Sequence, residues 1–535
     1  MNHKPMGNLS AVVQHLEMLQ ALVILLVVGQ HSARAESNEE WMKIAKHELN
    51  NALNKRDYTD VAKNVILFLG DGLGISTVTA ARIYKGQVQN RSGEETLLEF
   101  EKFPNVALSK TYNNDRQTPD SAGTGTAFLC GVKANLGTLG LSVSARRGDC
   151  SSAKGQEVTS ILDWAIAEGK SVGIVTTTRI THATPAAGYA HSPERNWESD
   201  ISVPYSNETC KDIKDIALQL VEKKNIQVIL GGGRRAFMMA NQTDPETNGT
   251  SRHRQDQRDL IKEWLYQSSI GGKSARYVWN KQQLADIDPQ TTDYLLGLFE
   301  ASHMQYDLER DTTPTGDPSI AEMTSKAIQI LKKNDKGFFL LVEGGRIDHG
   351  HHINSAKKAL RDVLAFDKAV AESDRLVSIS DTLTVVTADH SHVFTIGGYP
   401  NRGNNILGLV DPDHPNGPDD GMPRTTLGYG NGPAGQNRVN LTDVDTTADG
   451  YTQEATVKMS YETHSGEDVA IYARGPMAHL FHGVHEQHYI AHVMSFSACI
   501  GPYKGNCDRV TSTGVTLQFN ALVEVLLSLL FWSRL

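Results

Sequence analysis

Short apolar runs that alternate with helical segments constrain the fold of this chain more than any other feature. The apolar runs cover 64–69, 172–175, 227–230, 338–342, 383–387 and 469–472. Apolar residues at helical spacing lie between them, at 158–168, 213–223, 320–332 and 356–376. Buried strands that alternate with helices predict the α/β class, with a three-layer, doubly wound, mostly parallel sheet and helices on both faces.

Acidic residues and histidines directly follow or end several of these runs. Asp71 follows the first run, Glu343 the fourth, and Asp389 and His390 the fifth. In a doubly wound sheet, ligands bind beyond the carboxyl ends of the strands. We therefore expect these side chains to lie together at one edge of the sheet and to form the functional site.

The densest group of metal-type residues lies at 343–352. Asp348 and His352 are four residues apart, so a helical turn would aim both side chains at one ion. Mixed aspartate and histidine ligands suit zinc. His464 can complete this set of ligands, although a loop histidine is the alternative interpretation.

A second zinc site is predicted at Asp389 and His390. Asp71 lies between two glycines, a backbone that allows ions to approach closely, so its carboxylate can bridge two metals. Taken alone, such an aspartate is a turn residue. Four further histidines lie at three-residue spacing, and we interpret them as the polar face of a helix; they are His479, His482, His485 and His488.

Ser121 lies between Asp120 and a run of small residues. The run can continue as a helix over 122–130, and the unpaired N–H groups at the start of a helix favour an anion. A serine hydroxyl beside an anion site is a candidate phosphate acceptor, whereas the alternative is a serine that only caps the helix. Arg195 offers the guanidinium fork that suits two phosphate oxygens, unless it is an ordinary surface arginine.

The N-terminal end has the pattern of an export signal. An apolar run within 16–29 precedes Ala33-Arg34-Ala35, an arrangement typical of a cleavable signal peptide. We predict a signal peptide over 1–35, with a signal anchor as the alternative.

The C-terminal end has the outline of a GPI-anchor signal over 511–535. Small residues at 511–514 precede an apolar tail at 521–532, although Glu524 interrupts the tail. A disordered apolar end is the alternative. Together the two ends predict passage through the secretory pathway and a place on the extracellular face of the cell membrane.

Composition fits an exported protein. The formal charge of −10 over 535 residues argues against nucleic acid as the main partner. Five cysteines imply disulfides plus one thiol left over. Cys499 and Cys507 can close a small loop, Cys150 and Cys210 are a plausible second pair, and Cys130 is expected to be a buried free thiol. Glycosylation sequons occur at Asn90, Asn207, Asn241, Asn248 and Asn440.

Two segments fall outside the alternating pattern. Residues 38–53 have helical apolar spacing and predict an N-terminal amphipathic helix. Residues 399–461 are rich in Gly, Asn, Asp and Pro and show little periodicity. This composition indicates an insertion on the edge of the main domain.

Five ordered motifs resemble those of the alkaline phosphatases; they lie at 65–74, 119–124, 343–352, 387–392 and 463–468. Residues 172–191 resemble the animal branch of that family, and the likeness extends from about Trp41 to Cys507. The resemblance implies a catalytic domain over 36–398 and 462–510 and a crown-like inserted domain over 399–461. It also implies a homodimer, with the helix at 36–54 as its arm.

The resemblance implies a phosphomonoesterase that acts at alkaline pH through a phosphoserine at Ser121, with Arg195 holding the phosphate. One zinc ion would be held by Asp71, Asp389 and His390, and another by Asp348, His352 and His464. One magnesium ion would be held by Asp71, Thr184 and Glu343. The resemblance implies that Asp120 and His182 support these ligands from behind, and His349, from the dense group at 343–352, is expected to do the same.

The resemblance also implies a calcium site, formed by Glu246, the carbonyl of Phe299, Glu300 and Asp317. The disulfides of the family would be Cys150–Cys210 and Cys499–Cys507, with Cys130 free.

Two other functions remain open from the sequence. A phosphodiesterase or a sulfatase can share this fold, but such enzymes use threonine or formylglycine as the nucleophile, whereas this chain has Ser121 with Arg195. A catalytically silent cell-surface binding protein is expected to have lost metal ligands, and none is visibly lost.

Overall fold

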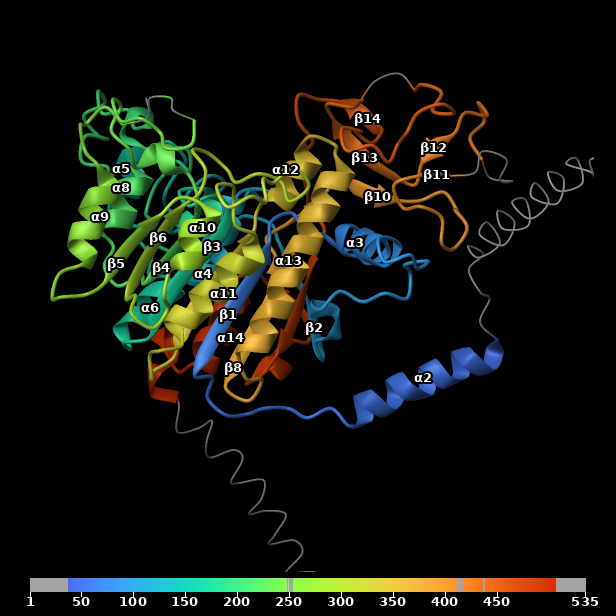
Figure 1. Ribbon diagram of the computed structural model, residues 1–535, viewed down its shortest axis with the longest axis horizontal. Coiled ribbons are helices and arrows are strands. Elements are labelled where there is room, and N and C mark those ends of the chain that lie inside the picture. The colour runs from blue at the N-terminus through green and yellow to red at the C-terminus, as the bar shows by residue number, and fades with distance from the viewer. Residues whose placement is uncertain (1–36, 248, 250–253, 411–416, 436–437, 507–535) are drawn as a thin grey trace, which may run out of the picture.

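The computed structural model describes residues 37–247, 249, 254–410, 417–435 and 438–506 (Figure 1). Its core is a ten-stranded sheet in the order β17-β2-β16-β8-β1-β7-β3-β4-β6-β5. All neighbouring strands in this sheet are parallel except that β16 runs antiparallel to both β2 and β8. The predicted fold class is therefore confirmed.

Six of the ten strands are those predicted from the apolar runs. They are β1 (Asn64–Gly70), β3 (Ser171–Arg179), β4 (Val228–Gly232), β7 (Phe338–Gly344), β8 (Thr382–Ala388) and β16 (Val469–Arg474). The four missed strands are β2 (Asn105–Lys110), β5 (Ala275–Val278), β6 (Tyr294–Leu298) and β17 (Gly483–Glu486). Three of them, β2, β5 and β17, lie towards the ends of the sheet, where one face or edge stays exposed and the apolar pattern is broken.

Helices cover both faces of the sheet, and alternate residues of β1 pack against the helices on each face. Val65 and Leu67 belong to the core that includes α4 (Ser121–Cys130), α6 (Ile161–Ala167), α8 (Ile216–Glu222) and α14 (Tyr489–Ser497). Ile66 and Phe68 belong to the opposite core, with α3 (Ile75–Gln87), α11 (Ile320–Leu331) and α13 (Ala356–Leu376). Because alternate residues of a strand point to opposite faces, a continuous apolar run is needed to fill both layers.

A smaller assembly of strands lies beside the large sheet (Figure 1, orange). It contains the three-stranded sheet β10 (Phe394–Ile396), β13 (Leu427–Gly432) and β14 (Ala455–Lys458). It also contains the pair β11 (Leu409–Val410) and β12 (Arg424–Thr425). Most of these strands fall within 399–461, but β10 precedes that range and pairs with β13, so this sheet begins before residue 399.

The N-terminal helix α2 (Asn38–Leu53) extends away from the body of the molecule (Figure 1). Ser37 and Glu40 form a capping box at its start, and none of its side chains is buried. Among the described residues, no helix is long and apolar enough to cross a membrane. The predicted signal peptide at 1–35 and anchor signal at 511–535 lie outside the described residues.

Candidate active site

The carboxyl ends of three adjacent strands bring the predicted ligands together. The central strand β1 lies between β7 and β8, and Gly70 pairs with Gly344 on one side and with Ala388 on the other. This common register places Asp71, Glu343 and Asp389 side by side, as the strand-end pattern predicts.

A first group consists of Asp71, Asp389 and His390, whose ligand atoms lie within 4.8 Å of one another. All three side chains are fully buried, and His390 Nε2 lies 3.2 Å from Asp389 Oδ2 and 3.5 Å from Asp71 Oδ1. Neither oxygen of Asp71 has a hydrogen-bond partner. Burial, together with the nearby carboxylates of Asp348, Asp389 and Glu343, raises the pKa of Asp71 well above its usual value. Such crowded carboxylates with unpaired oxygens fit a bound dication.

A second group surrounds Asp348. The helix α12 (Arg346–His352) presents Asp348 and His352 on one face, with Oδ2 of the aspartate 3.2 Å from Nε2 of the histidine, as the spacing of four predicts. His464 Nε2 lies 3.2 Å from Asp348 Oδ1 and 3.3 Å from His352 Nε2. His464 reaches this place because β15 (His464–Ser465) pairs with β9 (Ser391–His392).

A third group centres on Glu343, with Asp71 and His182. Glu343 Oε2 accepts hydrogen bonds from the hydroxyls of Thr176 and Thr178, while Oε1 has no partner. Burial raises the pKa of Glu343 to about 7. The hydroxyl of Thr184 is also buried without a partner. Carboxylate and hydroxyl oxygens are the ligands that magnesium prefers.

Ser121 is the first residue of α4 and is 2% exposed. The cap of this helix is Asp120, which accepts a hydrogen bond from Gly123 N, so the Ser121 hydroxyl does not serve as the N-cap. Ser121 Oγ instead lies 3.3 Å from His390 Nε2, against the first group of ligands. The structure therefore rejects the interpretation of Ser121 as a simple helix cap.

Arg195 lies beside the same helix terminus. Its Nη1 donates to Asp120 Oδ2 at 2.9 Å, and its Nη2 lies 3.3 Å from His182 Nε2. Burial opposes ionisation of Asp120, but Arg195 and two backbone N–H groups outweigh it and lower the pKa of this carboxyl. Asp120 therefore stays charged and fixes the guanidinium next to Ser121, which is not the setting of an ordinary surface arginine.

The sequence did not predict the roles of two residues at this site. They are His392, which contacts Asp348, and Glu462, which contacts His392. His392 Nε2 lies 2.9 Å from Asp348 Oδ1, and its Nδ1 donates to Glu462 Oε2 at 2.6 Å. Burial opposes the charge of His392, but Glu462 and Asp348 raise its pKa to about 10. Glu462 also accepts the Nδ1 hydrogen bond of His352 through its carbonyl at 2.5 Å. No local signal reveals this link, because Glu462 and His392 are 70 residues apart.

Three of the four residues predicted to bind calcium, Glu246, Glu300 and Asp317, line a separate pocket of about 530 Å³. Burial raises the pKa of Glu300 to about 7 and that of Asp317 to about 6. Phe299 is buried beside them at the end of β6. Glu246 accepts a hydrogen bond from Arg234 Nη2 at 2.8 Å.

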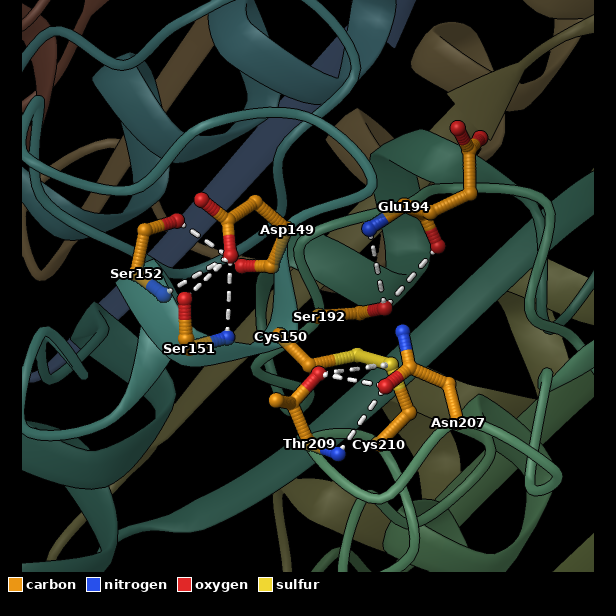
Figure 2. Close-up of a disulfide and its surroundings, with 9 residues drawn as sticks. All are labelled: Asp149, Cys150, Ser151, Ser152, Ser192, Glu194, Asn207, Thr209 and Cys210. Carbon is orange, nitrogen blue, oxygen red and sulfur yellow. Dashed lines mark hydrogen bonds between the residues drawn. A yellow bond between two sulfur atoms is a disulfide. The ribbon is translucent and has the colours of Figure 1, made fainter.

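A disulfide joins Cys150 to Cys210, and Ser192 and Glu194, which precede Arg195, lie in its surroundings (Figure 2). Asp149 caps the short helix α5 (Cys150–Ala153), and Gly148 N donates to Pro193 O at 2.9 Å. The predicted pairing and the buried free thiol of Cys130 are both confirmed. Cys507, the predicted partner of Cys499, lies outside the described residues.

The prediction of a helical face for the four spaced histidines is wrong. His479 lies in a short 3₁₀ turn, His485 lies on β17, and His488 precedes α14. Gly483, at a φ of 82°, breaks the run between the turn and the strand, a conformation that glycine adopts readily.

A family model and several known proteins match this chain. The family model described as alkaline phosphatase matches residues 62–500. The chain is 52% identical to the tissue-nonspecific isozyme of alkaline phosphatase from Gallus gallus over 506 residues, which is 93% of this chain and 96% of that protein. It is 52% identical to the same isozyme from Homo sapiens over 487 residues, covering 89% and 91% of the two chains.

Solved structures agree in fold. The crystal structure of Thermus thermophilus alkaline phosphatase aligns with a TM-score of 0.60 and 24% identity, and covers 84% of this chain and 94% of that one. The alkaline phosphatase from the Antarctic bacterium TAB5 aligns with a TM-score of 0.56 and 22% identity, and covers 83% and 99%.

Proposed function

This chain belongs to the alkaline phosphatase family of phosphomonoesterases, and we propose that Ser121 is its nucleophile and forms a phosphoserine. One observation carries the proposal. The Ser121 hydroxyl lies 3.3 Å from His390 Nε2, inside a group of buried carboxylates with unpaired oxygens, and Arg195 is held beside the same helix terminus.

We assign one zinc ion to Asp71, Asp389 and His390, and the other to Asp348, His352 and His464. We assign magnesium to Asp71, Thr184 and Glu343, and calcium to Glu246, the carbonyl of Phe299, Glu300 and Asp317. The unpaired oxygens of Asp71 and Glu343 and the unpaired hydroxyl of Thr184 support these choices. When bound, the two zinc ions would lower the pKa of a hydroxyl or a water and neutralise the leaving oxygen.

The residues then divide the reaction between them. Ser121 gives up its hydroxyl proton to water, its Oγ attacks phosphorus, the bond to the alcohol oxygen breaks, and the alcohol leaves with a proton taken from water. Water then attacks the phosphoserine, so that Ser121 regains its proton and inorganic phosphate leaves. Arg195 holds two phosphate oxygens through both steps, because Asp120 fixes its orientation.

A direct test is hydrolysis of 4-nitrophenyl phosphate at alkaline pH, with and without a chelator. We expect rapid hydrolysis that the chelator abolishes and that added zinc and magnesium restore. Faster hydrolysis of bis(4-nitrophenyl) phosphate would favour the phosphodiesterase alternative. Full metal content without hydrolysis of either compound would indicate a silent binding protein.

We expect Glu462→Gln to weaken zinc binding at Asp348, His352 and His464 by about 10- to 100-fold, because partners that orient metal ligands have effects of that size. The glutamine keeps the shape but loses the negative charge that holds His392 against Asp348, whereas the backbone carbonyl that accepts from His352 stays. Zinc titration of the purified variant, with the exposed Glu208→Gln as the control, measures the change. Unchanged zinc affinity would contradict the orienting role of Glu462.

We also propose that the chain is exported, GPI-anchored and homodimeric. The signal-like segment 1–35, the apolar tail and the five sequons support export and anchoring, and the exposed apolar side chains of α2 support a role as a dimer arm. The strands within 399–461 would form the crown-like domain.

A phosphatidylinositol-specific phospholipase C is expected to release the mature protein from cell membranes, since it cleaves the lipid of a GPI anchor. The measurement is phosphatase activity in the supernatant of treated and untreated cells. A protein truncated before residue 511 should be secreted without treatment. Activity that stays on the membrane after treatment would point to a different anchor.

A further inference from the structure

Three histidines meet at the carboxyl edge of the sheet and are not all explained by the sites above. His182 is the N-cap residue of α7 (Ala183–Ala187), His303 follows β6, and His349 lies on α12. One ring nitrogen of each lies within 4.8 Å of the others. The ring centroids are 4.2 Å apart for His303 and His349 and 5.2 Å apart for His182 and His303. We propose that this histidine triad binds a further zinc-class dication.

The ligand chemistry selects the ion. The triad offers imidazole nitrogens only, which suit zinc, copper or nickel, whereas magnesium and calcium prefer oxygen. Three protein ligands leave a fourth position open, as in zinc sites that also bind water or an anion. The three side chains are half-buried, so an ion can enter from solvent.

A ring nitrogen of the triad without a hydrogen-bond partner supports the presence of a bound metal ion. Nδ1 of His182 is buried and has no hydrogen-bond partner. Arg346 Nη1 lies 3.0 Å from Nδ1 of His349, so Nε2 is the nitrogen of that ring left to face an ion. A buried ring nitrogen without a partner is costly, and a bound metal ion would remove that cost.

Each imidazole also contacts an arginine, and these contacts limit the affinity of the triad for the ion. Arg195 contacts His182, Arg346 contacts His349, and Arg179 contacts His303 through both its backbone N–H and Nη1. An arginine only donates, so a ring nitrogen that accepts from it carries no proton; on His182 and His349 the proton then lies on the other nitrogen, whereas Arg179 faces both nitrogens of His303, only one of which can accept. Metal binding needs that proton to move. The arginine contacts and the metal are therefore alternatives, and the ion binds less tightly than those held by carboxylates.

Two of these arginines keep other partners when the site fills. Arg179 is paired with Glu198 at 2.7 Å, and Arg195 with Asp120 at 2.9 Å.

His182 also belongs to the group with Asp71 and Glu343, so its substitution would disturb two sites. His303 belongs to the triad alone, which makes it the residue to test.

The test is equilibrium dialysis of the purified full-length protein against Zn²⁺, with saturating Mg²⁺, for wild type and His303→Asn. We expect the wild type to bind one more zinc ion per chain than the variant, and this extra ion to be the first that a chelator removes. His482→Asn, which alters an exposed histidine remote from the triad, is the matched control and should bind as the wild type does.

Equal zinc stoichiometry in wild type and His303→Asn would overturn the proposal. If His303→Asn also loses its tightly bound zinc, the difference in stoichiometry no longer reports on the triad alone. Crystals of the wild-type protein then decide whether the triad binds zinc. Crystals soaked in Zn²⁺ should then show an anomalous peak about 2.0–2.1 Å from the three nitrogens, and no peak there would overturn the proposal. Both readouts count ions and not turnover, so they stand apart from the test of the phosphatase reaction.

Discussion

Ser121→Ala is expected to lower the turnover of 4-nitrophenyl phosphate by roughly three orders of magnitude or more, because loss of a nucleophile removes the covalent route altogether. The hydroxyl lies against His390, while the cap of α4 is the neighbouring Asp120, so the fold and the zinc content should stay near those of the wild type. Activity, circular dichroism and metal analysis of the purified variant check each part.

A labelled substrate sharpens this result. Rapid quenching of the wild type with ³²P-labelled phosphate monoester should trap the label on Ser121. Ser151→Ala, which changes an exposed serine of α5, is the control and should keep both turnover and label. A phosphoserine mapped to any other residue would refute the assignment of the nucleophile.

Asp71→Asn is expected to lower the content of both zinc and magnesium. Asp71 is the one residue assigned to two ions, and its oxygens have no hydrogen-bond partner. If both ions bind, their mutual repulsion at a separation near 4 Å would be roughly four times the ~4 kcal/mol of a unit-charge pair at an effective dielectric near 20, and a shared carboxylate would offset it. Removal of the negative charge between them should therefore empty both sites, although the shape of the side chain is kept.

Asp348→Asn is the matched comparison, because Asp348 is assigned to one ion only. This variant should lose mainly the zinc held with His352 and His464, and its phosphoserine should form but hydrolyse slowly. Metal analysis and single-turnover kinetics of the two variants separate the roles. Full zinc and magnesium in Asp71→Asn would show that Asp71 does not bridge the ions.

The main parts of the fold and of the site are local in sequence, and those parts could be predicted. Apolar runs such as 64–69 must be strands buried on both faces, and the residue that ends or follows such a strand must lie at the edge of the sheet. The spacing of Asp348 and His352 is one helical turn, which puts both on one face of α12 whatever the rest of the chain does. Ser121, ahead of small residues, starts a helix for the same local reason.

Other features depended on contacts between distant segments. The pairing of β15 with β9 brings His464 to Asp348 and places Glu462 where it orients both His392 and His352. His303 meets His182 and His349 only because β6, β3 and β7 end at the same edge. The sequence by itself determined the elements and the residues at their ends, since these follow from nearest neighbours along the chain. Only the tertiary structure decided which distant histidines and carboxylates share a site, because no local propensity specifies a pairing between segments 70 or more residues apart.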